Sequence, residues 1–229
     1  MPPQNQNFET ARTRKFRESS LAKEDERTIS HIEEFGCSVV NVARTNHGVG
    51  WSYTIGIFDT SGKPEILTVG LPPETAHSAL NEAAKRLRAG VDLTQGRHRD
   101  LVGEVDCEFR PVGQKWLRQL MGWAIWYYKG DDFPVLQAVY PDRKNRFPED
   151  EGFDKGFEQP LMQPTAPMTQ AENDFGPPLI RKAVCTTGNF QTIRIRESFF
   201  PKRSTKELSL SHSFHTTPMM APGSSWVTV

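Results

Sequence analysis

The sequence predicts an α+β domain with a mainly antiparallel sheet of about five strands and about three helices packed on it. Two patterns indicate this class. Short apolar, β-branched runs of strand length recur between residues 37 and 140, and they intermingle with longer segments whose apolar residues recur at helical spacing. Clusters rich in glycine, proline, asparagine and aspartate separate these segments, as turns do.

The first predicted helix and strand follow each other directly. Residues 21–35 carry Ile29, Ile32 and Phe35 at helical spacing, and Gly36 is a suitable residue to end that helix. Residues 37–43 are largely apolar and include three β-branched valines, which favours a strand.

A hairpin and a second helix are predicted next. Residues 51–58 and 64–70 read as two strands joined by a turn over residues 59–62. A helix then begins at residues 71–73, where proline is tolerated in the first turn, and its alanine and leucine stripe ends at Gly90.

The second half predicts two more strands and one aromatic helix. Residues 104–111 and 133–140 have the character of strands. Residues 114–128 form a helical segment with three tryptophans and two tyrosines, more aromatic surface than a solvent-facing helix needs. We therefore expect this helix to pack against the sheet.

Composition divides the chain into four parts. Residues 1–19 are polar and of mixed charge, which is typical of a flexible N-terminal arm. Residues 20–164 contain the periodic segments and form the expected α+β core domain. Residues 165–178 have the composition of a linker. Residues 179–229 form a C-terminal region in which only an alternating run at 191–196 suggests a strand.

Charge is balanced overall but uneven along the chain. Residues 181–229 carry seven Lys/Arg and two Asp/Glu, although the whole chain has a formal net charge of zero. Such a region can lie as a solvated tail on an acidic body, or it can contact nucleic-acid phosphates weakly through residues 181–206.

Several classes of protein are excluded. No run of about 18 apolar residues exists to span a membrane, and the N-terminus lacks the apolar segment of a secretory signal. Cys37, Cys107 and Cys185 share no metal-ligand spacing, and an odd number argues against a disulfide framework. We expect buried, unreactive thiols and a cytoplasmic location.

Several short segments in a fixed order carry a family resemblance. They include WSYTIG at 51–56, PEIL at 64–67, PVLQAV at 134–139 and RFP at 146–148, followed by QPL at 159–161. On these segments, residues 31–164 resemble a bacterial family known as domain of unknown function 4262. The resemblance implies a folded unit and a bacterial origin, and it leaves the mechanism and the cofactor unknown.

Polar residues inside apolar strands are the candidate site residues. We expect His47 to act as an acid or base, with Glu65 or Asp142 orienting it. Tyr53, Thr54 and Gln137 are the expected ligand-binding residues, since each places a polar group within an apolar strand.

The same residues also have an ordinary structural interpretation. His47 and Asp142 suit turns, Glu65 suits the surface, and Gln137 suits a core amide whose hydrogen bonds are satisfied. No residue pattern for a metal ion is present, and neither is a glycine-rich phosphate loop or a Gly-x-Ser-x-Gly motif.

Three functions therefore stay open. The first is a binding domain that holds a small polar ligand or a protein partner on the sheet face or the aromatic helix. The second is a small hydrolase-like enzyme that uses His47 with Asp142 or Glu65. The third is a weak nucleic-acid binder that uses the basic C-terminal region.

Overall fold

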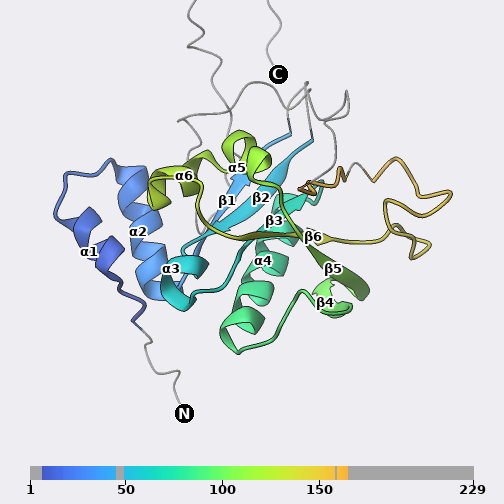
Figure 1. The fold of residues 1–229 in the computed structure, drawn as a ribbon, viewed down its shortest axis with the longest axis horizontal. Helices are drawn as coiled ribbons and strands as arrows, with labels where there is room; N and C mark the ends of the chain where they lie inside the picture. Colours follow the sequence, from blue (N-terminus) through green and yellow to red (C-terminus); the bar gives the residue numbers. More distant parts are fainter. Residues whose placement is uncertain (1–6, 45–48, 158, 165–229) are drawn as a thin grey trace, which may run out of the picture. The chain divides into compact units, whose positions relative to one another are not determined.

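A mixed sheet flanked by helices forms the centre of the fold (Figure 1). The computed structural model describes residues 7–44, 49–157 and 159–164. In these residues six strands lie in the order β1-β2-β3-β6-β5-β4. Their bounds are β1 Ser38–Val42, β2 Trp51–Ile55, β3 Glu65–Val69, β4 His98–Val102, β5 Val105–Pro111 and β6 Val135–Val139. The helices are α1 Ala11–Arg17, α2 Lys23–Phe35, α3 Ile57–Ser61, α4 Pro73–Arg88, α5 Gln114–Leu120 and α6 Gly122–Tyr128.

Strand pairing confirms the predicted α+β class and its mainly antiparallel sheet. β2 pairs with β1 and with β3 in antiparallel fashion, so the predicted hairpin is present. β5 pairs antiparallel with both β4 and β6. β3 and β6 are parallel, with Glu65 opposite Val135. This one parallel pair decides which ends of the strands lie together.

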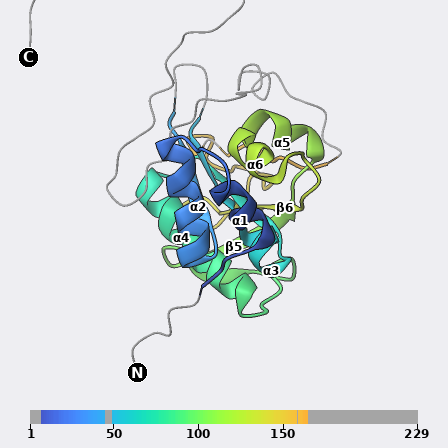
Figure 2. The same ribbon diagram turned by 90° about the vertical axis from the view of Figure 1, so that its left-hand side faces the viewer.

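Two apolar layers cover the two faces of the sheet. One contains Ile29 and Ile32 of α2, strand residues such as Tyr53, and the buried face of α5 and α6. The other contains the alanine and leucine stripe of α4 against Ile66 and Leu136. Figure 2 shows α4 on the other side of the strands from α5 and α6. The aromatic segment packs on the sheet as predicted, and Trp116 and Tyr127 are fully buried.

Helix α1 lies within the segment that composition assigns to a flexible arm. Thr10 begins the helix through a capping box with Thr13, which satisfies backbone N–H groups at the helix start. Phe16 is only 7% exposed, and its ring centroid lies 4.8 Å from that of Trp126 and 5.6 Å from that of Tyr127. Phe16 therefore helps to dock a polar helix that has no apolar stripe.

The predicted strand 51–58 ends early, at Ile55. Gly56 follows with a φ of 108°, a left-handed conformation that favours glycine, and a Cβ there would lie 2.9 Å from Ile32 Cγ1. Helix α3 then occupies most of the expected turn. The predicted helix 114–128 is likewise divided into α5 and α6 at Met121, whose φ and ψ are −118° and 42°. Strand β4 was not predicted, because residues 98–102 are mostly polar.

Two of the cysteines behave as predicted. Cys37 and Cys107 are buried free thiols. Burial raises the pKa of each thiol to about 11, so both stay protonated and unreactive at neutral pH. Cys185 lies outside the described residues.

Candidate functional site

Glu65 is a fully buried carboxylate at the start of β3. Its Oε1 accepts hydrogen bonds from the backbone N–H of Gly56 (2.8 Å), the backbone N–H of Phe58 (3.1 Å) and the Tyr128 hydroxyl. Its Oε2 accepts from Thr54 Oγ1 at 2.5 Å. Burial raises the pKa of Glu65, and the four hydrogen bonds oppose this effect without cancelling it.

Thr54 connects this carboxylate to the sheet. The register between β2 and β3 ends at Tyr53 and Leu67, so the backbone ladder stops one residue short of Thr54. The Thr54 hydroxyl replaces the missing bond by accepting from Ile66 N at 2.8 Å while it donates to Glu65. Thr54 and Glu65 are therefore in hydrogen-bond contact. Their hydrogen bonds join strands β2 and β3 to helix α3.

Tyr53 and Gln137 are also held within the fold. Tyr53 is 1% exposed, and its hydroxyl accepts from the backbone N–H of Trp123 at 3.3 Å. Gln137 donates to Pro160 O at 2.8 Å and accepts from Met162 N at 2.7 Å. The Gln137 amide has the partners that its burial requires, and it fixes the segment 159–162 beside β6.

Asp142 organises the loop that follows β6. It is 2% exposed, and it accepts backbone hydrogen bonds from Lys144 (2.8 Å), Arg146 (3.0 Å) and Asp154 (3.0 Å). The Arg146 guanidinium lies 2.7 Å from Oδ2. Burial alone would raise the pKa of Asp142, but the hydrogen bonds, with those from Arg146 the strongest, outweigh it and lower the pKa well below its usual range.

The parallel register separates the two predicted carboxylates. Glu65 lies opposite Val135 at the start of β6, whereas Asp142 follows the end of that strand. At about 3.3 Å per residue, the two side chains are on the order of 15–20 Å apart along the strand direction. His47 lies outside the described residues, so its pairing with either carboxylate stays a prediction.

A second polar cluster joins α1, α3 and α6. Asp59 of α3 accepts hydrogen bonds from the Thr10 hydroxyl (2.5 Å) and the Tyr127 hydroxyl (2.8 Å). Arg12 Nε lies 3.4 Å from the other Asp59 oxygen, and Arg12 Nη1 donates to Tyr127 O at 3.0 Å. The guanidinium carbon lies 5.4 Å and 5.2 Å from the ring centroids of Tyr127 and Tyr128.

The adjacent tyrosines connect this cluster to the buried carboxylate. Tyr127 binds Asp59, Tyr128 binds Glu65, and their ring centroids are 5.0 Å apart. Burial raises the pKa of both phenols, and the neighbouring carboxylate raises each further. Both tyrosines are therefore fixed hydrogen-bond donors at neutral pH.

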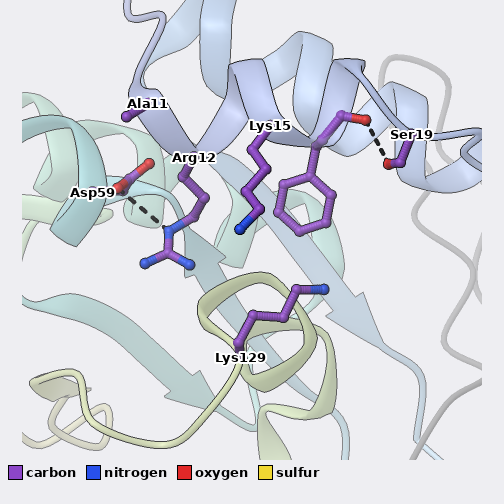
Figure 3. Close-up of a pocket in the computed structure, with 7 residues that line it drawn as sticks. Ala11, Arg12, Lys15, Ser19, Asp59 and Lys129 are labelled. Carbon is purple, nitrogen blue, oxygen red and sulfur yellow. Dashed lines mark hydrogen bonds and ion pairs between the residues drawn. The ribbon is translucent and has the colours of Figure 1, made fainter.

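A pocket of about 520 Å³ opens beside this cluster (Figure 3). Figure 3 shows the side chains of Arg12 and Lys15 extending from α1 toward the turn that carries Lys129. The Lys129 ammonium lies 4.6 Å from the ring centroid of Phe16 and 5.4 Å from that of Trp126. The lining residues are Ala11, Arg12, Lys15, Phe16, Ser19, Asp59 and Lys129.

Positive charge dominates the pocket. Arg12, Lys15 and Lys129 are cationic, and Asp59 is the one acidic residue in the lining. Within the part of the chain that the structure describes, neither lysine forms an ion pair with a carboxylate, whereas Asp59 is held by three donors. The arrangement suits the binding of an anion.

Sequence reasoning did not identify these pocket residues. Weak signals were present: Thr10 and Thr13 have capping-box spacing, and Phe16 is an isolated aromatic residue in a polar segment. Lys129 directly follows the aromatic segment, where a helix end is expected. None of these signals shows that the three segments meet.

Neither a candidate metal cluster nor a membrane-spanning helix occurs among the residues that the structure describes. There, no group of three or more His, Cys, Asp and Glu side chains could hold a metal ion. Over the same residues, the helices are too short or too polar to cross a membrane.

Comparison with known proteins identifies a family. Residues 31–154 match the family described as Domain of unknown function (DUF4262), which confirms the resemblance seen in the sequence. No curated protein and no solved structure matches the chain. The match includes Asp59 and Lys129, while the pocket residues on α1 precede it.

Proposed function

This chain belongs to the DUF4262 family, and we propose that it is a small-molecule-binding protein whose ligand occupies the pocket between α1, α3 and α6. The observation that carries the proposal is the pocket itself. Its volume of about 520 Å³ lies within the range of about 300–1,000 Å³ that is usual for ligand sites. It also combines an aromatic ring with several charged groups that point toward one space.

The walls of the pocket are preorganised. The Thr10 capping box and the bond from Thr10 to Asp59 hold the start of α1 against α3. The burial of Phe16 against Trp126 and Tyr127 holds the end of α1 against α6. Preorganised walls reduce the conformational entropy that a ligand must overcome when it binds.

The polar groups of the lining favour binding over catalysis. Asp59 accepts from three donors, and the Ser19 hydroxyl donates to Phe16 O at 2.7 Å. A general base or a nucleophile needs a free position near the reacting atom. Neither residue has the activating partner of a nucleophile–base pair, so the lining supports recognition without turnover.

Ligand binding can be tested by thermal shift with the full chain. A panel of small anionic, neutral and cationic aromatic compounds should contain members that raise the thermal midpoint, because a ligand of the folded state stabilises it by mass action. The shift should shrink in Lys15→Met and persist in Lys155→Met. Both lysines are exposed, but only Lys15 lines the pocket.

Two results would contradict the proposal. A panel without a single stabilising compound would argue against a ligand site of this kind. A compound that stabilises the wild type and Lys15→Met equally would bind elsewhere on the protein.

A further inference from the structure

We infer that the ligand of this pocket is a dianion attached to a small aromatic body, of the class represented by aryl phosphate monoesters and aromatic dicarboxylates. This inference rests on the proposed ligand-binding function and assigns its chemical class. Three features support it: the net charge of the pocket lining, the contacts that the cationic side chains already make, and the apolar residues Phe16 and Ala11.

The pocket lining carries a net positive charge. The lining holds three cations, Arg12, Lys15 and Lys129, against the single carboxylate of Asp59, a net charge of +2. A monoanion would leave one positive charge uncompensated in a partly enclosed space, where the effective dielectric is lower than in water. A dianion matches the lining.

The Arg12 guanidinium is only weakly bound to Asp59. The contact between Arg12 Nε and Asp59 is 3.4 Å, longer than the roughly 2.7–2.9 Å of a strong charge-assisted bond. Asp59 instead takes its short bonds from Thr10 and Tyr127. The Arg12 guanidinium therefore keeps capacity for a second anionic group.

The two lysines act differently from Arg12. The Lys129 ammonium lies over the rings of Phe16 and Trp126, which hold it at the pocket without neutralising it. Lys15 extends into the same space from α1 (Figure 3). Two ammonium groups beside one planar guanidinium suit a compact group that bears two negative charges.

The aromatic part of the proposed ligand is inferred from the apolar residues of the pocket lining. Phe16, which is 7% exposed, and Ala11 supply the apolar residues of the lining. A flat ring can lie against this wall while its anionic group reaches the cations. Inorganic phosphate alone would use the charges and leave the wall uncovered.

The test uses ligands of nearly equal shape and different charge. Phenyl phosphate is a dianion at pH 8, because its second pKa is about 6. Phenyl sulfate has the same tetrahedral group with a single charge. Calorimetric titration of the full chain at low salt should give phenyl phosphate an affinity at least about tenfold higher than phenyl sulfate, a difference of about 1.4 kcal/mol.

Variants and two further probes complete the experiment. Lys15→Met and Lys129→Met should each reduce this preference to about threefold or less, because one removed charge leaves a lining of net charge +1. Lys155→Met should leave it unchanged. Phthalate compared with phenyl phosphate distinguishes a carboxylate source of the two charges from a phosphate source, and inorganic phosphate tests the need for the ring.

The outcomes separate this inference from the proposed function. Equal binding of phenyl sulfate and phenyl phosphate in the wild type would overturn the dianion class and leave the binding function intact. The same holds if the anions fail while a neutral or cationic compound still gives a shift sensitive to Lys15. Failure of every compound in the thermal-shift panel would instead remove the proposed function itself.

Discussion

Replacement of Glu65 by alanine should destabilise the protein by about 2–4 kcal/mol even though it removes a buried carboxyl group. Three donors lose their acceptor in this variant: the Phe58 N–H and the hydroxyls of Thr54 and Tyr128. The Gly56 N–H keeps Tyr128 Oη, 3.1 Å away, as an alternative acceptor.

The magnitude follows from opposing contributions. An unsatisfied buried donor costs about 1–3 kcal/mol, and the hydroxyls recover part of this cost by rotating. Removal of a carboxylate whose pKa is raised by burial returns part of the desolvation free energy. The net loss should therefore fall below the sum for three orphaned donors.

A pH series with Glu65→Gln separates charge from hydrogen bonding. The folded state raises the Glu65 pKa above its ordinary value of 4.5. Between pH 4.5 and the folded-state pKa, the folded protein therefore binds more protons than the unfolded chain. Stability from this group is therefore present at low pH and is lost as the pH rises from 4.5 through the folded pKa. The wild type should lose stability relative to Glu65→Gln by up to about 1.4 kcal/mol per pH unit in that window.

Urea denaturation followed by tryptophan fluorescence measures both effects. Glu65→Ala within about 0.5 kcal/mol of the wild type would show that the donors find other acceptors, and the anchoring role would be wrong. A wild type that gains stability relative to Glu65→Gln as the pH rises would refute the sign of the electrostatic argument.

Three further predictions concern the backbone, the loop and the domain limits. Gly56→Ala should cost about 1–3 kcal/mol in the same denaturation assay, since its φ of 108° and its contact with α2 leave no room for a Cβ. Asp142→Asn should lower the thermal midpoint and speed proteolysis after Arg146, and the wild type should lose this stabilisation as the pH falls below 3.8, because the folded state lowers the Asp142 pKa. A fragment of residues 7–164 should unfold cooperatively and at a higher temperature than a fragment of residues 20–164, which lacks α1; equal midpoints would show that the docking of α1 contributes nothing.

Local patterns in the sequence were sufficient for most elements of the sheet. The runs at residues 37–43, 64–70 and 133–140 are β-branched and apolar because both faces of the sheet are covered by helices. Helix α4 was predictable because its alanine and leucine stripe faces one apolar layer. The family resemblance was also visible in the sequence, since it depends on the order of short segments.

The candidate site was only partly predictable. Glu65, Thr54 and Gln137 were selected as polar residues in apolar strands, and the structure buries all three with hydrogen-bond partners. Their selection identified groups that need partners, because a buried polar group is costly when it is unpaired. It could not identify those partners, which come from α3, α6 and the segment 159–162.

Tertiary structure alone decided which polar residues lie together. The parallel pairing of β6 with β3 places Asp142 far from Glu65, and strand composition does not encode that direction. The pocket joins Arg12, Asp59 and Lys129 from three distant segments. The sequence by itself determined most of the strand and helix segments and several of the polar residues that need partners, because propensity and periodicity are local. Packing of Phe16 on Trp126 and Tyr127 helps to join α1 to α6, and such long-range packing leaves no periodic trace in the chain.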